Sequence, residues 1–387
     1  MKILAFLPLV LSLAPAAYAE QELTADCAAR PEHQFVEALK EPDKVGRAGM
    51  VAVCLSATEA RPGLVLVGGG ANFPYAKPGA KTPEERGEKV FYSDVRVASA
   101  ISENEKQQEQ ARKMHGMSVD MPRPIAYAAF VPTDRGMLIA GGCNADGHTA
   151  KVSRVDMVDD ELRVEALPDL PRTLAYPAFA VVGNKVYVMG GQEKADSTTC
   201  LNSCFMLNLA DINAGWRELA PMPGARMLAA AGVVDGVIYV MGGCSLAPDA
   251  EGNGQRTYLK DVLCYDPGSD TWAKVGAEMP ETNVGMATPL PSLGAKLYVV
   301  GGDPGNYYRA SLAGNAPAEH PGQSRDVYSF TPATGEWKKL GELPIGVATF
   351  PVVPFPSRNA LQTFSGETHP GIRTPMSFMI KLNAVQP

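Results

Sequence analysis

One stretch near the C-terminus gathers an acid, an imidazole and a guanidinium within seven residues. Residues 365–375 contain Glu367, His369 and Arg373, with a Pro-Gly pair between the last two. A glutamate that lies beside cationic side chains in a channel can act as a general base, because it can take a proton from a bound hydroxyl. The alternative is a surface loop with a solvated ion pair, which contributes little. This stretch is the first candidate site.

Four arginines share a second context, since each leads into a short segment of small and apolar residues. They are Arg47, Arg123, Arg172 and Arg226, and Asn283 takes this place in a fifth segment. If their guanidinium groups converge, they form a cationic funnel suited to a small carboxylate, because the guanidinium fork matches two carboxylate oxygens. The alternative for each one is a bond to a loop carbonyl.

The elements that would position these side chains repeat along the chain with a period of about fifty residues. A Gly-Gly doublet ends a short apolar strand at Val67-Gly68-Gly69, Ala140-Gly141-Gly142, Met189-Gly190-Gly191, Met241-Gly242-Gly243 and Val300-Gly301-Gly302, with a degenerate sixth copy at Phe364-Ser365-Gly366. Each copy reads as four short antiparallel strands, and the fourth opens with an aromatic residue at Trp216, Trp272 or Trp337 in three of them. Because they recur at one position, these aromatics are predicted to pack between sheets.

This pattern resembles the kelch repeat, whose signature is a Gly doublet after the second strand and an aromatic in the fourth. Kelch repeats form propeller blades, so the resemblance implies an all-β fold, a six-bladed β-propeller around a central channel. The C-terminal copy has only three strands, at about 347–353, 360–364 and 376–382. Residues 34–39 are predicted to supply its fourth strand, which would close the ring and bring the two termini together.

The first nineteen residues have the layout of a cleavable secretory signal peptide. Lys2 precedes the apolar run 3–13, which is too short to span a bilayer, and the small-x-small site ends at Ala19. Residues 20–387 are then expected to form one propeller domain in the periplasm. The net charge of −7 and the lack of a basic run give no reason to expect nucleic acid or a membrane surface as a partner.

The cysteines are expected to form disulfides in an exported chain rather than a metal or catalytic site. There are seven, so at least one remains unpaired within the chain. Cys200 and Cys204 are close enough to pair locally, and Cys27 with Cys54 would tie down the N-terminal segment, but the spacing leaves the connectivity open. The five histidines show no metal-ligand spacing, so no metal or cofactor is expected.

The altered sixth copy carries a second resemblance. The run Gly366-Glu367-x-x-Pro370-Gly371-x-Arg373-Thr374 resembles the active-site loop of the N-acetylneuraminate epimerases, or sialic acid mutarotases, which are exported six-bladed kelch propellers. Residues 69–74 followed by 87–94 resemble the Gly-Gly-Ala block and long loop of one blade in those enzymes. The first segment lies at the C-terminus and the second near the N-terminus, which is typical of a cyclically permuted branch. A closed ring with adjacent termini tolerates this change.

The resemblance implies that the protein opens and recloses the ring of N-acetylneuraminate or a related sugar acid. In that family the glutamate of the loop is taken as the proton acceptor and the arginine as a substrate ligand, which by direct match are Glu367 and Arg373. Arg123, Arg172 or Arg226 would help to hold the substrate carboxylate.

Two more residues complete the candidate site. His369 is a candidate substrate contact and, with water as the alternative, the acid that protonates the ring oxygen; Asn72 is a candidate polar contact. The competing hypothesis is a non-catalytic kelch propeller that binds a glycan or a protein. The position of Glu367 discriminates the two, because a carboxylate outside the channel mouth would exclude the enzyme.

Overall fold

A computed structural model of the 387-residue chain describes residues 22–29, 46–57, 62–75, 83–101 and 105–385. The predicted signal peptide and the predicted strand at 34–39 lie outside these residues. Among the helices that the structure describes, none is both long and apolar enough to cross a membrane.

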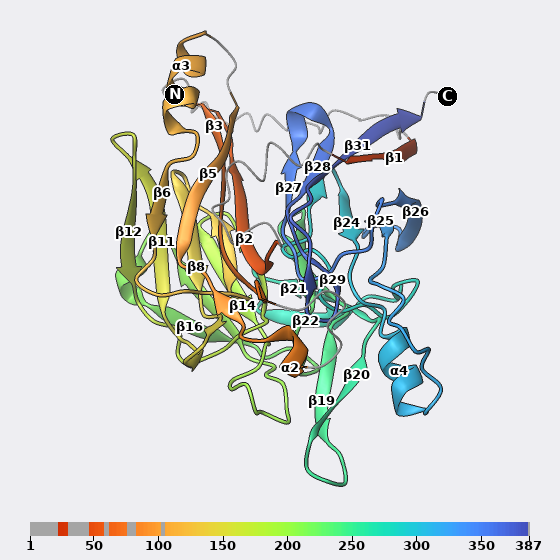
Figure 1. Cartoon of the computed structure of the whole chain (residues 1–387). Helices are drawn as coiled ribbons and strands as arrows, with labels where there is room; N and C mark the ends of the chain where they lie inside the picture. The colour runs from red at the N-terminus through yellow and green to blue at the C-terminus, as the bar shows by residue number, and fades with distance from the viewer. Residues whose placement is uncertain (1–21, 30–45, 58–61, 76–82, 102–104, 386–387) are drawn as a thin grey trace, which may run out of the picture.

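The described chain forms six twisted antiparallel sheets arranged around one axis, as Figure 1 shows. Blade 1 consists of β2 (Ala48–Leu55), β3 (Gly63–Asn72), β5 (Asp94–Ile101) and β6 (Ser118–Asp120). Blade 2 consists of β7 (Ala129–Pro132), β8 (Gly136–Ala140), β11 (Val152–Val158) and β12 (Glu161–Leu167). Blade 3 consists of β13 (Ala178–Val182), β14 (Lys185–Met189), β15 (Cys204–Asn208) and β16 (Trp216–Leu219). Blades 4 and 5 consist of β17 (Ala230–Val234), β18 (Val237–Met241), β21 (Val262–Asp266) and β22 (Thr271–Lys274); and β23 (Ser292–Leu293), β24 (Lys296–Val300), β25 (Asp326–Thr331) and β26 (Glu336–Glu342). The prediction of an all-β, six-bladed propeller is confirmed.

Blade 6 joins the two ends of the chain. Its C-terminal strands are β27 (Val352–Phe355), β28 (Ala360–Thr363) and β31 (Phe378–Val385), and its outer strand is β1 (Glu22–Ala29). β1 pairs antiparallel with β31, and Figure 1 shows the two side by side. An N-terminal strand therefore closes the ring as predicted, but the described strand precedes the predicted 34–39.

Short elements extend from the blades. They are the strand β4 (Val90–Phe91), the hairpins β9 (Cys143–Asn144) with β10 (Gly147–His148), β19 (Cys244–Pro248) with β20 (Gly254–Tyr258), and β29 (Glu367–His369) with β30 (Ile372–Arg373), and the helices α2 (Pro83–Arg86), α3 (Glu105–Met114), α4 (Asn306–Leu312), η2 (Ile212–Ala214) and η3 (Pro356–Arg358). In Figure 1 the β19–β20 hairpin, α2 and α4 lie on the lower side of the ring, and α3 lies on the upper side.

Two of the three outer-strand tryptophans form hydrogen bonds to the neighbouring blade, whereas Nε1 of Trp337 is buried without a hydrogen-bond partner among the described residues. The indole N–H of Trp272 donates to the carbonyl of Ala220 at 2.8 Å, and that of Trp216 donates to the carbonyl of Pro168 at 2.9 Å. Each of these two rings thus packs against the preceding blade and satisfies its polar group there.

The Gly doublets also bind neighbouring blades to each other. The second residue of each doublet donates its N–H to the carbonyl of the residue that leads into the next blade. The six bonds are Gly70 to Ile125, Gly142 to Leu174, Gly191 to Arg226, Gly243 to Asn283, Gly302 to Val347 and Gly366 to Arg47, at 2.7 to 3.0 Å. In blade 1, which has three consecutive glycines, the doublet is therefore Gly69-Gly70, one residue later than predicted.

Ser365 occupies a position that a glycine fills in the other five blades. Its φ is 57°, in the left-handed region that non-glycine residues rarely adopt. Its hydroxyl accepts the N–H of Arg47 at 2.6 Å and lies 2.8 Å from the carbonyl oxygens of Arg47 and Thr374, either of which can accept its proton. These bonds hold the strained backbone that leads directly into Glu367.

A substitution in a doublet should reveal how tightly the backbone packs within a blade. Gly191 has a φ of +95°, and an added Cβ would lie 2.6 Å from the carbonyl oxygen of Ala175. Left-handed strain and overpacking together predict that Gly191→Ala lowers the free energy of unfolding by about 2–4 kcal/mol. Gly236→Ala is the matched control, because Gly236 has a φ of +78° and no atom within 4 Å of its added Cβ. Urea unfolding that gave equal losses for both would refute the packing argument.

The innermost residues of the blades form a closed circle of backbone hydrogen bonds around the axis. One residue per blade has a φ between 53° and 66°, and each donates its N–H to the carbonyl of the preceding member, over 2.5 to 3.0 Å. The six members of this axial ring are Gly49, Tyr127, Tyr176, Leu228, Gly285 and Thr349. The main chain therefore surrounds the axis closely at this level.

Candidate active site

A cavity of about 710 Å³ lies directly over the axial ring. The ring residues Tyr127, Tyr176, Leu228, Gly285 and Thr349 line it, and so form its floor. Its wall includes the residue that follows the Gly doublet in blades 3, 5 and 6, namely Gln192, Asp303 and Glu367. The volume is in the range of small-molecule binding sites.

The described residues on the opposite side of the axial ring enclose a much smaller space. This void measures about 50 Å³ and is lined by all six ring residues together with mostly apolar neighbours such as Phe130 and Phe179. Of these two spaces, the one on the side of Glu367 is large enough for a sugar.

Glu367 is held in the cavity wall by its own hairpin. Its backbone exchanges two hydrogen bonds with Ala348, each of 2.9 Å, which fix the start of β29. Its Oε1 accepts the N–H of Gly371 at 3.0 Å across the turn to β30. The side chain is 17 % exposed, so the carboxylate is oriented and still accessible from the cavity.

Arg373 lies beside this carboxylate. Its Nη2 is 3.1 Å from Oε2 of Glu367, its side chain is 4 % exposed, and its guanidinium carbon is 5.2 Å from the centre of the Phe73 ring. Within the described residues, its Nε and Nη1 are buried and have no hydrogen-bond partner. Buried donors without a partner are rare in proteins, so these two point to a ligand. The structure thus brings together the predicted Glu367 and Arg373.

Two tyrosines of the floor extend the site. The rings of Tyr127 and Tyr176 are 4.8 Å apart. Burial raises the pKa of Tyr127 to about 12 and that of Tyr176 well above its ordinary value, so both hydroxyls are neutral donors near pH 7. Sequence reasoning missed them. The signal was the repeated Ala-Tyr at 126–127 and 175–176, which precedes the inner strand of two successive blades.

The far wall of the cavity belongs to the β19–β20 hairpin and blade 5. Tyr258 donates its hydroxyl to Oδ2 of Asp303 at 2.8 Å, and the backbone N–H of Arg256 donates to the hydroxyl of Tyr308 at 3.0 Å. Arg256 also lines the cavity. These residues give the wall polar groups that sequence reasoning did not select.

Two of the predicted funnel arginines are bound within their own blades. Arg226 is 3 % exposed, forms two 2.9 Å bonds with the carboxylate of Asp261, and donates to the carbonyl of Gly242 at 3.2 Å. Arg47 is equally buried and pairs with Asp94 at 2.7 Å. Their guanidinium groups connect strands, as the alternative interpretation had it, and the cavity lining does not include them.

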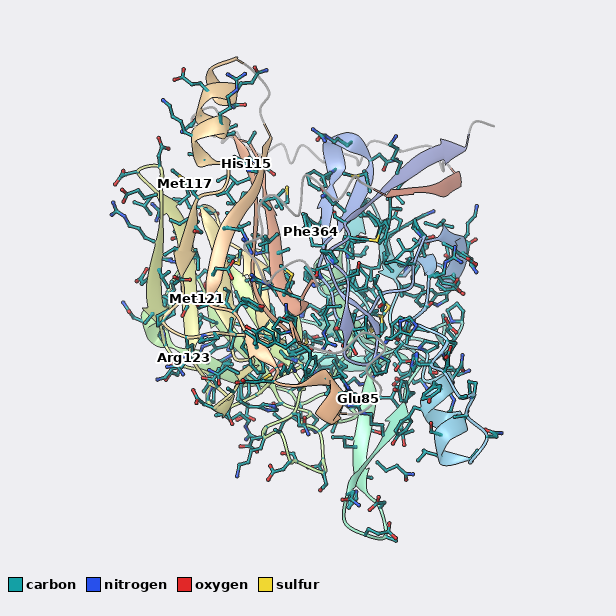
Figure 2. All side chains as sticks on the ribbon, viewed as in Figure 1. Glu85, His115, Met117, Met121, Arg123 and Phe364 are labelled. Carbon is teal, nitrogen blue, oxygen red and sulfur yellow. The ribbon has the colours of Figure 1, made fainter. Side chains whose placement is uncertain are left out.

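The other two arginines lie elsewhere. Arg123 and Arg172 are exposed and do not line the cavity; Nη1 of Arg123 is 3.4 Å from the hydroxyl of Thr149. Figure 2 shows Arg123 at the lower left of the ring. The hydrogen bonds of the doublets explain why, because the positions equivalent to Arg47 and Arg226 are Ile125 and Leu174. The described structure therefore contains no funnel of four converging arginines.

Asn72 and His369 are also placed apart from the cavity lining. Asn72 is fully buried, where its Nδ2 donates to the carbonyl of Gly46 and its Oδ1 accepts the hydroxyl of Tyr92, both at 3.0 Å. Its amide is thus engaged in the scaffold. Nδ1 of His369 lies 3.3 Å from the hydroxyl of Thr368, and its ring centre is 5.8 Å from that of His320.

The expectation of disulfides is wrong for the cysteines that the structure describes, and Cys200 and Cys204, which are close enough in sequence to pair, do not. The six cysteines whose side chains are described are free thiols. Cys204 is buried in the core at the start of β15, whereas Sγ of Cys200 lies 3.5 Å from the carbonyl oxygen of Cys244. The proposed pairing of Cys27 with Cys54 lies outside the described residues, because the side chain of Cys27 is not among them. No cluster of three or more potential metal ligands occurs in the described part of the chain.

Comparison with known proteins confirms the resemblance to the epimerase family. A family model described as N-acetylneuraminate epimerase matches residues 167–325. The chain is 27% identical over 243 residues to the N-acetylneuraminate epimerase of Haemophilus influenzae (strain PittEE), which covers 57% of this chain and 60% of the relative. It is 28% identical over 232 residues to that of Yersinia enterocolitica, covering 54% and 56%, and 25% identical over 232 residues to a Kelch domain-containing protein of Vibrio cholerae, covering 54% and 62%.

These matches have a limited extent. The chain spans about 60% of the length of the curated relatives that it matches. The family match ends at residue 325 and does not include Glu367 or Arg373.

Proposed function

We propose that this relative of the N-acetylneuraminate epimerases is a mutarotase that interconverts the α and β anomers of N-acetylneuraminate or a related sugar acid. One observation carries the proposal: the carboxylate of Glu367 lies in the wall of a sugar-sized cavity, beside an arginine with two unfilled donors. A base and a carboxylate ligand side by side are what anomer exchange of an acidic sugar requires.

Glu367 acts as the base in this proposal. The anomeric carbon of such a sugar carries both a hydroxyl and the carboxylate, so a carboxylate bound at Nε and Nη1 of Arg373 brings the hydroxyl close to Glu367. Glu367 takes the hydroxyl proton as the ring opens, and it returns a proton when the ring recloses on the other face. The reaction uses no cofactor.

The cavity floor supplies the remaining contacts. The rings of Tyr127 and Tyr176 offer apolar surface to a sugar, and their neutral hydroxyls can donate to its oxygen atoms. On the far wall, Arg256 and Asp303 are available to the substituents of the sugar. This combination of apolar surface with a few polar groups is typical of small-molecule sites.

Proton NMR of freshly released α-N-acetylneuraminate tests this proposal. Addition of the protein is expected to make the α signal decay faster than its spontaneous exchange, in proportion to protein concentration. General acid–base catalysis accounts for about 10²- to 10⁴-fold of such an acceleration. Decay at the spontaneous rate would refute the mutarotase, and binding of the sugar without acceleration would favour the non-catalytic kelch propeller.

Export to the periplasm belongs to the same proposal and rests on the N-terminal pattern alone. N-terminal sequencing of the protein from a periplasmic extract is expected to begin at Glu20. A mature protein that retains Met1 would contradict it.

A further inference from the structure

Lys89 is a charged residue near the candidate site to which the proposed function gives no role. It directly precedes β4, whose Phe91 pairs with Ala71, the residue that follows the Gly doublet in blade 1. Its Nζ lies 4.9 Å from the ring centre of Tyr127 and 5.0 Å from that of Phe91. The ammonium group therefore overlies a ring that forms part of the cavity floor.

Lys89 makes no hydrogen bond or ion pair with the described residues; only the two ring faces contact its charge. This differs from Lys151, whose Nζ lies 2.5 Å from a carboxylate oxygen of Asp169 at the surface. A half-buried ammonium with no anionic partner has donors available for a ligand in the adjacent cavity.

The surroundings of Lys89 also suit proton transfer. Burial has the largest effect on the pKa of the Lys89 ammonium and lowers it below the ordinary value for lysine. The charge of Arg373 lowers this pKa further, whereas Cys143 and Glu367 partly offset the shift. Glu367 and Arg373 both influence this pKa, and Nζ of Lys89 overlies the ring of Tyr127, which lines the same cavity as Glu367. An ammonium with a lowered pKa gives up its proton more readily near neutral pH, as an effective general acid must.

Other candidates for this acid are weaker. Burial raises the pKa of Tyr127 to about 12 and that of Tyr176 well above its ordinary value, so both hydroxyls hold their protons tightly. Neither His369, the predicted candidate, nor Lys89 is among the residues that line the cavity. Of the two, Lys89 lies over a ring of the cavity floor, whereas His369 contacts Thr368 and the ring of His320. Lys89 combines a position over the Tyr127 ring of the cavity floor with an available acidic proton.

We propose that Lys89 is the general acid of anomer exchange, which donates a proton to the ring oxygen while Glu367 removes the proton of the anomeric hydroxyl. This inference rests on the proposed function. As the bond between the anomeric carbon and the ring oxygen breaks, its electron pair moves to the oxygen, which takes the proton from Nζ. The carbonyl forms from the hydroxyl that Glu367 deprotonates.

Reclosure reverses both transfers. After rotation of the open chain, the new hydroxyl attacks the opposite face of the carbonyl carbon and returns its proton to the neutral amine of Lys89. Protonated Glu367 gives its proton to the former carbonyl oxygen. Both groups thus end in their starting states, and no other reactant is consumed.

Two substitutions separate an acid from a carboxylate ligand at this position. Lys89→Met keeps the unbranched apolar stem, and it is expected to reduce kcat by about 100-fold, within the range for loss of one acid, with little change in KM. Lys89→Arg keeps the positive charge, but a guanidinium does not give up its proton at ordinary pH, so kcat should remain as low. If Lys89→Arg restored activity and Lys89→Met mainly raised KM, the proposal would be overturned in favour of a carboxylate ligand.

The pH profile and a control complete the test. Because the acid works in its protonated form, kcat of the wild type should fall as the pH rises through the pKa of Lys89, and this fall should be absent in Lys89→Met. The groups that face Lys89 and shape this profile are Cys143, Tyr127, Glu367 and Arg373. Lys151→Met serves as the control with unchanged kcat.

The possible failures are distinguishable. Wild-type acceleration that Lys89→Met leaves intact would overturn the role of Lys89 alone, whereas a wild type without any acceleration would overturn the proposed function and the role of Lys89 with it. Circular dichroism of both variants checks that they fold, so that a loss of kcat can be assigned to the missing acid.

Discussion

Replacement of Glu367 by glutamine is expected to reduce the catalysed rate of anomer exchange by about 10²- to 10⁴-fold, since general-base catalysis contributes this much. The amide keeps the size of the side chain and can still accept the N–H of Gly371, but it cannot take a proton from the anomeric hydroxyl. The measurement is the decay of the α-anomer signal by NMR, at equal concentrations of variant and wild type. Glu218→Gln, on the exposed face of β16, is the matched control and should exchange the anomers at the wild-type rate.

Calorimetric titration with the sugar should accompany this comparison. If Glu367 is the base, the variant loses turnover while much of its affinity for the sugar remains at Arg373. A variant with the wild-type rate would exclude Glu367 as the base. A variant without affinity would instead assign Glu367 to substrate binding.

The second large effect is expected on stability. Arg226→Met should lower the free energy of unfolding by about 3–5 kcal/mol, because it leaves the carboxylate of Asp261 without its partner in a largely buried site. The loss includes both 2.9 Å bonds to Asp261 and the bond to the carbonyl of Gly242. Arg172→Met, at an exposed position, is the control and should change the stability by less than about 0.5 kcal/mol.

A double variant tests the cause of this loss. When Asp261→Leu accompanies Arg226→Met, no charge remains unpaired, and much of the stability should return, because apolar replacement of a buried ion pair is often neutral. Urea unfolding measures all four proteins. If Arg226→Met had the same free energy of unfolding as Arg172→Met, the buried ion pair would not stabilise blade 4.

Much of the fold could be predicted from the repeat, because each blade packs against its neighbours in the same way. The doublets need glycine because a Cβ on the first residue would meet the next blade and a Cβ on the second would meet its own blade. The outer strands need large aromatic rings, so both features recur visibly in the sequence. The closing strand was harder to place. Its position depends on pairing with β31, more than three hundred residues away, and no local pattern specifies such a partner.

The candidate site was predictable only where its residues lie close together in the chain. Glu367 and Arg373 belong to one hairpin, so their spacing already implied proximity. The four arginines were predicted to be equivalent because they are of one residue type, but they are not. In blades 2 and 3 the positions that Arg47 and Arg226 occupy in their own blades belong to Ile125 and Leu174. Lys89 comes from blade 1 and Tyr127 from blade 2, and only the closed ring brings them beside blade 6.

The axial ring determines by which route a sugar could enter and leave the cavity. Because the axial ring narrows the axis, and the void described beneath it measures only about 50 Å³, the cavity is a cup rather than a tube. Under the proposed function, substrate and product use the same opening. Each anomer that leaves then competes there with the next one that arrives.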